Sequence, residues 1–213
     1  MSQHRTPTST RGHRFFASFY ERISQGKAEK QYMEPIRKEL VGQAKGLVLE
    51  VGAGNGLNFA YYNPALVERV EATEPDSAML RYARTRATAA PVPIKLTQTP
   101  VEQLPFADEY FDSVVCTLVF CSVNDPLKGL QEIRRVLKPG GQLLLVEHVR
   151  ARVPFNAFIQ DLITPLTRLF LGNCHWNRNT EQTVQAAGFQ EITRERSMPV
   201  GELMPLVTIQ ASR

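Results

Sequence analysis

Residues 46–56 read GLVLEVGAGNG, a short apolar run that leads directly into glycines at every second position. The apolar part, residues 47–51, has the length and composition of a buried β-strand. Glycines after a strand allow the backbone N–H groups of the turn to approach a bound ligand closely. A strand followed by such a turn predicts a ligand site at the start of an α/β fold.

The spacing of these glycines argues against two other glycine-rich loops. A dinucleotide fingerprint needs its third glycine at position 57, where this chain has Leu57. A Walker loop ends in Gly-Lys-Ser/Thr, and no such triplet follows Gly56. Glu74, however, stands at the end of the next predicted strand, 67–73, where a carboxylate can accept hydrogen bonds from both hydroxyls of a ribose. The glycine turn and Glu74 together predict that the chain binds a nucleoside.

The rest of the chain alternates between predicted strands and helices. Further strands are expected at 67–73, 91–97, 111–118 and 142–149, with helices at 15–41, 76–89 and 125–137. This order predicts an α/β fold, a doubly wound and mostly parallel sheet with helices on both faces. The last third is expected to hold helices at 154–171 and 179–188 and strands at 189–195 and 203–211. Two strands after the last helix predict a C-terminal antiparallel hairpin at the edge of a seven-stranded sheet.

The expected elements divide the chain into a tail and a single domain. Residues 1–14 carry Arg5, Arg11 and Arg14 without a carboxylate, and their polar composition predicts a disordered basic tail. Residues 15–213 are expected to form one domain. Its parts are a helical cap (15–45), a ligand-binding core (46–150), and a C-terminal part with the last helices and the hairpin (151–213).

Composition and charge exclude several classes of protein. The net charge of +4 comes mostly from the tail, so the chain lacks the basic groove of a nucleic-acid-binding protein. Its apolar runs are strand-sized, and it has neither a membrane span nor a secretory signal, so a cytoplasmic location is expected. The three cysteines lack metal-binding spacing, which predicts free thiols and no metal. A monomer is expected, and peripheral contact with a membrane stays open.

Three separate stretches then identify a family resemblance. Residues 48–56, FDSVV at 111–115 and VLKPGG at 136–141 together resemble the class I S-adenosylmethionine-dependent methyltransferases, a Rossmann-like family. The resemblance implies that S-adenosyl-L-methionine is the cofactor. It also implies that Glu50 anchors the methionine amine through the loop, that the glycine loop cradles the methionine part, and that Glu74 binds the ribose. The implied cofactor-binding residues are Glu50, Gly52, Ala53, Gly54, Gly56, Glu74, Pro75, Val101, Glu102 and Thr117.

A closer resemblance extends over nearly the whole chain. CTLVFCSV at 116–123, EHV at 147–149 and LGNCHWNRNT at 171–180 are similar to the methyltransferase-like protein 7 group of thiol S-methyltransferases. This resemblance implies methyl transfer to a small, hydrophobic acceptor, with a thiol favoured. A lipid, quinone or amine acceptor is the alternative within the same enzyme class. A nicotinamide-dependent oxidoreductase and a cofactor-binding protein without catalysis are the alternatives from other classes.

Candidates for the chemistry stand near the ends of the predicted strands. His148 lies at the carboxyl end of the fifth strand, where such sheets bind ligands, and is either a general base or a structural histidine. The acceptor-pocket candidates, each with plain packing as its alternative, are Tyr20, Phe120, His175 and Trp176. Residues 154–171 carry a helical stripe of Phe, Ile and Leu that is expected to pack in the core, with a lid or a membrane-facing surface as alternatives.

Overall fold

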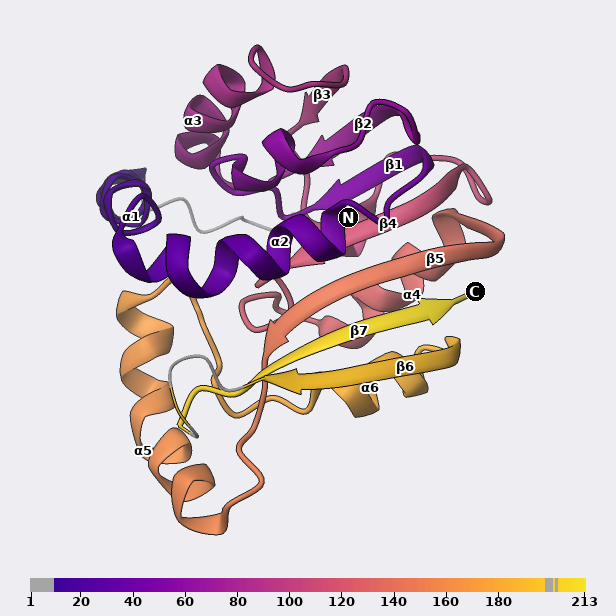
Figure 1. Cartoon of the computed structure of the whole chain (residues 1–213). Coiled ribbons are helices and arrows are strands. Elements are labelled where there is room, and N and C mark those ends of the chain that lie inside the picture. Colours follow the sequence, from indigo (N-terminus) through magenta and orange to yellow (C-terminus); the bar gives the residue numbers. More distant parts are fainter. Residues whose placement is uncertain (1–9, 198–200, 202) are drawn as a thin grey trace, which may run out of the picture.

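Seven strands form one sheet in the computed structural model, which describes residues 10–197, 201 and 203–213 (Figure 1). The strands are β1 (Gly46–Val51), β2 (Val67–Thr73), β3 (Ile94–Thr97), β4 (Phe111–Thr117), β5 (Leu137–His148), β6 (Gln190–Ser197) and β7 (Leu206–Ser212). Their order is β3-β2-β1-β4-β5-β7-β6. Strands β1 to β5 pair in parallel, whereas β7 is antiparallel to both β5 and β6. The expected mostly parallel sheet with a C-terminal antiparallel hairpin is therefore confirmed.

Helices cover both faces of this sheet and enclose two apolar layers. The helices are α1 (Thr10–Ile23), α2 (Glu34–Val41), α3 (Ser77–Ala87), α4 (Pro126–Val136), α5 (Pro154–Phe170) and α6 (Thr180–Ala186). Leu130 of α4 and Val184 of α6 belong to one layer, and Leu40 of α2 and Ala83 of α3 belong to the other. Figure 1 shows α2 and α4 on opposite faces. Within the described ranges, no helix is both long and apolar enough to cross a membrane.

Aspartates placed just before apolar stretches start two of these helices. The carboxylate of Asp76 accepts a hydrogen bond from the N–H of Ala78 at 2.7 Å and caps α3. Asp125 caps α4 in the same way through the N–H of Lys128, at 3.0 Å. Each cap satisfies a backbone donor that has no partner inside its helix. The local sequence therefore decides where these helices begin.

Two elements begin five residues earlier than the sequence predicts. Helix α1 begins at Thr10, so the last five residues of the expected tail 1–14 are helical; residues 1–9 lie outside the described residues. Strand β5 begins at Leu137, earlier than the expected 142, because the Pro139–Gly141 turn is taken into the strand as an irregularity in its pairing with β4.

Helix α5 presents the opposite face to the one expected. Its buried residues are Ala157, Gln160, Thr164 and Thr167. Gln160 makes this polar face suitable for burial, because its side chain accepts from the N–H of Ala151 at 2.8 Å and donates to the carbonyls of Val149 and Leu203. The large apolar side chains of α5 face outward instead. The expectation that the apolar stripe packs in the core is therefore wrong.

Candidate active site

A cavity of about 640 Å³ lies at the carboxyl ends of the central parallel strands. There the strand order reverses, because β2 and β4 lie on opposite sides of β1. Open α/β sheets bind ligands at such a point, and the volume is in the range of small-molecule sites. Figure 1 shows α1 and α5 on the side of the molecule toward which the parallel strands point. The topology thus places the cavity where the glycine turn predicts a ligand.

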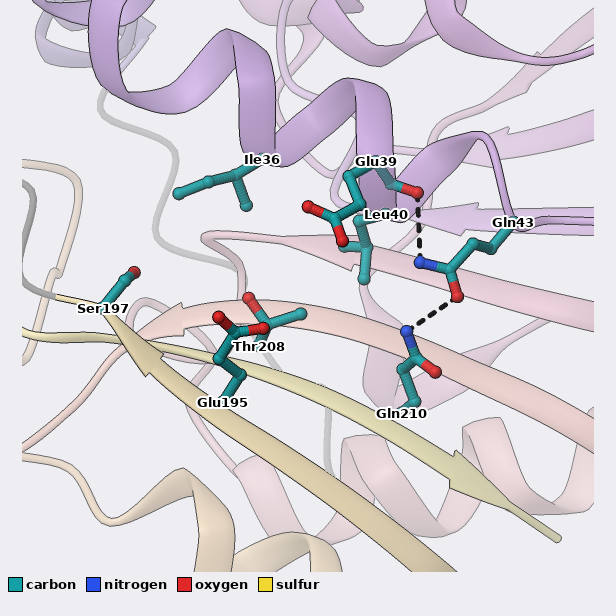
Figure 2. A pocket seen from close by; sticks show the side chains of 8 residues that line it. All are labelled: Ile36, Glu39, Leu40, Gln43, Glu195, Ser197, Thr208 and Gln210. Carbon is teal, nitrogen blue, oxygen red and sulfur yellow. Dashed lines mark hydrogen bonds between the residues drawn. The ribbon is translucent and has the colours of Figure 1, made fainter.

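A second hollow lies between α2 and the C-terminal hairpin (Figure 2). It measures about 90 Å³, which is too small for a nucleoside. The amide of Gln43 crosses it, donating to the carbonyl of Glu39 at 3.1 Å and accepting from the Gln210 amide at 2.7 Å. These hydrogen bonds tie α2 to β7, so this hollow is a packing feature.

The large cavity brings together nearly all of the predicted cofactor residues. Those that line it are Glu50, Gly52, Ala53, Gly54, Glu74, Pro75, Val101, Glu102 and Thr117. Gly56 is the exception, because it packs against Phe59 and Ala83; a Cβ there would lie 2.7 Å from the Phe59 ring. Gly56 therefore shapes the turn from behind and does not contact the cavity.

Two glycines of the turn have different structural roles. Gly52 and Gly54 both have left-handed backbone angles, with φ of 61° and 56°. A Cβ on Gly52 would lie 2.7 Å from the Val119 side chain, so Gly52 permits close packing of the loop after β4. A Cβ on Gly54 would meet only the carbonyl oxygen of Gly52, at 4.0 Å. The missing side chain of Gly54 therefore leaves open space in the cavity.

Glu74 follows β2 and directs both oxygens of its carboxylate at backbone donors. Oε2 accepts from the N–H of Gly54 and Oε1 from the N–H of Asp76, each at 2.9 Å. Burial raises the pKa of this carboxyl to about 7, although the two N–H donors act to lower it. Each oxygen keeps a second lone pair, so the ionised group can still accept two hydroxyl hydrogens.

Glu50 lies near the end of β1, lines the cavity and accepts hydrogen bonds from two neighbouring side chains. Its Oε1 accepts from Asn58 Nδ2 at 3.0 Å and its Oε2 accepts from the Tyr62 hydroxyl at 2.6 Å. Asn58 Nδ2 also donates to Thr117 Oγ1 at 3.0 Å. Burial raises the pKa of Glu50 to about 7, against the hydrogen bonds and the positive charge of Arg37, which lower it. Glu50 therefore fixes the Asn58 amide and adds negative charge to the wall of the cavity.

Arg37 is the basic side chain of the cavity, and the sequence-based reasoning missed it. Its Nε donates to Glu29 Oε1 at 2.6 Å and its Nη1 donates to Asn58 Oδ1 at 2.9 Å, although the residue is only 4% exposed. Among the described lining residues it is the only Lys, Arg or His, whereas Glu50, Glu74, Asp76 and Glu102 supply carboxylates. The one sequence signal was a charged residue on the apolar stripe of a helix, three positions before Leu40.

The structure does not bring His148 to the cavity. His148 ends β5, and its Nδ1 is buried without a hydrogen-bond partner among the described residues. Burial lowers the pKa of the imidazole to about 4, so it is neutral throughout the range around pH 7. The role of His148 as a general base therefore stays a prediction.

The four acceptor-pocket candidates separate into two groups. Tyr20 of α1 lines the cavity, and burial raises the pKa of its hydroxyl. Phe120 is fully buried in the apolar layer under α4. His175 and Trp176 are half-buried and do not line the cavity; His175 Nδ1 contacts the carbonyl oxygens of Asn173 and Cys121. Of the four, only Tyr20 is in a position to contact a ligand there.

Glu147 holds the loop after β4 against the cavity. Its side chain is fully buried and accepts hydrogen bonds from three consecutive N–H groups, those of Val119, Phe120 and Cys121. This arrangement satisfies three backbone donors in a turn where Leu118 has a positive φ of 57°. Leu118 and Val119 line the cavity as a result, and neither had been assigned from the sequence.

Comparison with known proteins gives matches at the level of domain, sequence and fold. A family model described as a methyltransferase domain matches residues 49–145. Thiol S-methyltransferase TMT1B from Homo sapiens is 36% identical over 187 residues, covering 82% of this chain and 75% of that protein. The ubiquinone/menaquinone biosynthesis C-methyltransferase UbiE from Bordetella avium is 39% identical over 82 residues, covering 38% and 32%. A solved S-adenosylmethionine-dependent methyltransferase from Thermotoga maritima has a TM-score of 0.67 at 23% identity, covering 95% of this chain and 98% of that chain, which shows a common fold.

Proposed function

Because the chain belongs to the S-adenosylmethionine-dependent methyltransferases, in the family that includes the thiol S-methyltransferases, we propose that it methylates the sulfur of a small hydrophobic thiol. The observation that carries the proposal is the cavity, where the glycine turn, Glu74 and Arg37 converge from three different elements. A lipid, quinone or amine acceptor is the second candidate, because quinone methyltransferases are also related to the chain.

The residues around the cavity are chemically suited to the parts of the cofactor. The two oxygens of Glu74 are positioned to accept from a ribose, and Val101 and Glu102 line the wall beside it, where the adenine is expected. Arg37 offers a guanidinium to the carboxylate of the methionine part. The four lining carboxylates suit a ligand with an ammonium and a sulfonium charge. When bound, the cofactor supplies an activated methyl group on a sulfonium centre.

The acceptor has a different set of walls available to it. Phe16 and Tyr20 of α1 line the cavity together with Leu171, Gly172 and Asn173, which follow α5. A displacement at a methyl group requires an acceptor that is held close, aligned and desolvated. A thiol with a pKa near 8.5 supplies part of its thiolate at neutral pH without a side-chain base. Positioning by these walls is then sufficient for transfer to sulfur.

The protein also has the cysteine chemistry expected of a reducing compartment. Cys116, Cys121 and Cys174 are all free and buried. Free thiols persist where glutathione and thioredoxin keep cysteines reduced. The three thiols therefore support a cytoplasmic place of action.

The acceptor class is tested by supplying S-adenosylmethionine with a panel of small apolar thiols, amines, a quinol and a lipid, and detecting the methylated product by mass spectrometry. We expect methyl thioethers from the thiols and a rate that rises with pH toward the thiol pKa. A Gly54→Val variant, which is expected not to bind the cofactor, is the control for uncatalysed methylation. Methyl transfer to amine, quinol or lipid without transfer to any thiol would contradict the proposal.

Arg37 is expected to bind only the amino-acid part of the cofactor. Arg37→Met should weaken binding of S-adenosylhomocysteine about 10- to 100-fold, because a hydrogen bond between charged groups contributes about 1.5–3 kcal/mol. Binding of 5′-methylthioadenosine, which has no carboxylate, should stay unchanged. Calorimetric titration of both ligands measures the difference.

The matched control for Arg37 is Glu29→Gln. Glu29 pairs with Arg37 at 2.6 Å but does not line the cavity, so this variant changes the pair without removing the guanidinium. It should bind S-adenosylhomocysteine at least as well as the unaltered protein. Equal losses for both ligands in Arg37→Met would instead mean that Arg37 supports the fold of the cavity and not the carboxylate.

A further inference from the structure

Helix α5 carries a continuous apolar face on its outside. Six side chains form this α5 face, with exposed fractions between 59% and 74%: Phe155, Phe158, Leu162, Leu166, Leu169 and Phe170. At 3.6 residues per turn they fall within a stripe about 120° wide. The opposite side of the helix is buried through Ala157, Gln160, Thr164 and Thr167. The helix is therefore amphipathic with its apolar side away from the protein.

The exposure is concentrated in one region of the molecule. Thirteen large apolar side chains are exposed among the described residues, and eight of them lie in residues 153–171. Phe19 and Ile23 of α1 are two more, with 43% and 48% of their surfaces exposed. Scattered exposed apolar residues are ordinary, but a cluster of this kind marks a surface that interacts with another protein or with a membrane. The fold itself gives no reason for the cluster, because the polar side of α5 already packs through hydrogen bonds.

The charges next to the α5 face are mainly positive. Arg152 precedes α5 and Arg168 lies within it; both are exposed and have no ion pair within the described ranges. The acidic residue of α5, Asp161, is neutralised by Arg150 at 2.6 Å. On α1, Glu21 is likewise paired with Arg86, at 2.7 Å. An anionic surface would therefore meet two uncompensated arginines, one just before α5 and one near its C-terminal end.

We propose that the α5 face docks on the surface of an anionic lipid bilayer. Phe and Leu on one side of a helix, with flanking arginines, are suited to enter the boundary between head groups and acyl chains. A second copy of the chain fits less well, because each copy would bring the same unpaired arginines, Arg152 and Arg168, to a shared interface, where like charges repel. The bilayer therefore matches both the apolar character of the face and the charge of its neighbouring arginines.

Docking of the α5 face would place one wall of the cavity next to the lipid. Leu171, Gly172 and Asn173 follow α5 directly and line the cavity. Gly172 is also the point where α1 meets this segment, because a Cβ on it would lie 2.9 Å from the Phe16 ring. The end of the α5 face and one wall of the cavity are thus the same stretch of chain. An apolar acceptor dissolved in the bilayer would meet the protein at that wall.

The test is flotation of the full chain with vesicles of phosphatidylcholine and phosphatidylserine, without cofactor. We expect the protein to float with the vesicles, less at high salt, and less with phosphatidylcholine alone. The double variant Phe158→Ser/Leu162→Ser should reduce the bound-to-free ratio at least tenfold, because both side chains are more than 60% exposed and available for insertion. Leu66→Ser, at a residue 49% exposed just before β2, is the matched control and should bind like the unaltered protein.

Binding of S-adenosylhomocysteine by each variant checks that the fold is retained, and Leu169→Ser, at the most exposed position, serves if the double variant does not fold. The proposal is overturned if the unaltered protein stays in solution, or if the α5 variants float as well as Leu66→Ser. It is also overturned if the unaltered protein is a dimer that the α5 variants convert to a monomer while none of them binds vesicles. The readout is lipid binding, so none of these outcomes depends on which acceptor is methylated.

Discussion

Gly54→Val is expected to abolish cofactor binding, whereas Gly140→Val is expected to leave it intact. The two glycines have similar left-handed φ angles, 56° and 71°, and an added Cβ meets almost nothing at either position. Both variants should therefore carry a similar backbone strain, on the order of 1–3 kcal/mol. Only Gly54 lines the cavity, so only there does the new side chain occupy the space that the methionine part needs.

The measurement for this pair is the dissociation constant of S-adenosylhomocysteine together with the melting temperature of each ligand-free variant. We expect similar decreases in melting temperature and a loss of affinity of at least about 100-fold, or 2.7 kcal/mol, in Gly54→Val alone. If Gly54→Val still bound the ligand with ordinary affinity, the glycine turn would not hold the cofactor. If Gly140→Val lost the ligand too, backbone strain and not the occupied space would be the cause.

Glu74→Ala is expected to weaken binding of S-adenosylhomocysteine and of 5′-methylthioadenosine alike, by roughly 10-fold to more than 100-fold. Both ligands contain the ribose, and its hydroxyls lose a charged acceptor that contributes about 1.5–3 kcal/mol. This pattern differs from that of Arg37→Met, which should spare the ligand without a carboxylate. An unchanged dissociation constant for both ligands would remove Glu74 from the ribose site.

The ionisation of Glu74 should also make the binding of S-adenosylhomocysteine depend on pH. Burial raises the pKa of Glu74 to about 7, and the ionised form is the one that accepts both hydroxyls. Affinity should therefore be constant above pH 7 and fall by up to tenfold for each pH unit below it. Glu50, whose pKa is also about 7, can add a second step of the same sign. Titrations between pH 5.5 and 8.5 should show a shallower slope for Glu74→Ala than for the unaltered protein.

The stability of the ligand-free protein should change with pH in the opposite direction. A carboxyl whose pKa is higher in the folded than in the unfolded state binds its proton more tightly when folded. The contribution of Glu50 and Glu74 is therefore fully present below pH 4.5 and is lost as the pH rises through about 7. Bound cofactor should oppose this loss, because it favours the ionised carboxylates.

Much of the fold is determined by short-range features of the sequence. Apolar runs of strand length, the caps Asp76 and Asp125, and glycines with positive φ each act through neighbouring residues, so the pattern of strands and helices follows from the chain itself. The order of these elements then places the end of β1 beside the end of β2. For this reason the sequence alone assigns the glycine turn and Glu74 to one site, and the N–H of Gly54 donates to Glu74 Oε2 at 2.9 Å.

Other parts of the site depend on residues that meet only in the folded protein. Arg37 reaches the cavity because α2 packs where its guanidinium can contact Glu29 and Asn58, and no local pattern encodes that meeting. Phe120 follows β4 and His148 is the last residue of β5, so both stand at strand ends, where ligand residues are expected. The turn held by Glu147 nevertheless directs Phe120 into the core, and His148, which is half-buried, does not line the cavity.

Helix α5 shows most clearly what the sequence alone does not determine. Its periodicity determines that one side is apolar and the other polar, but a period contains no information about which side faces the protein. Contacts with other parts of the folded chain determine which side of α5 faces the protein. The backbone groups of Val149, Ala151 and Leu203 satisfy the Gln160 side chain, which makes burial of the polar side favourable and leaves the apolar side outside. The sequence alone determined that the helix is amphipathic, and only the tertiary structure decided that its Phe and Leu side chains face outward.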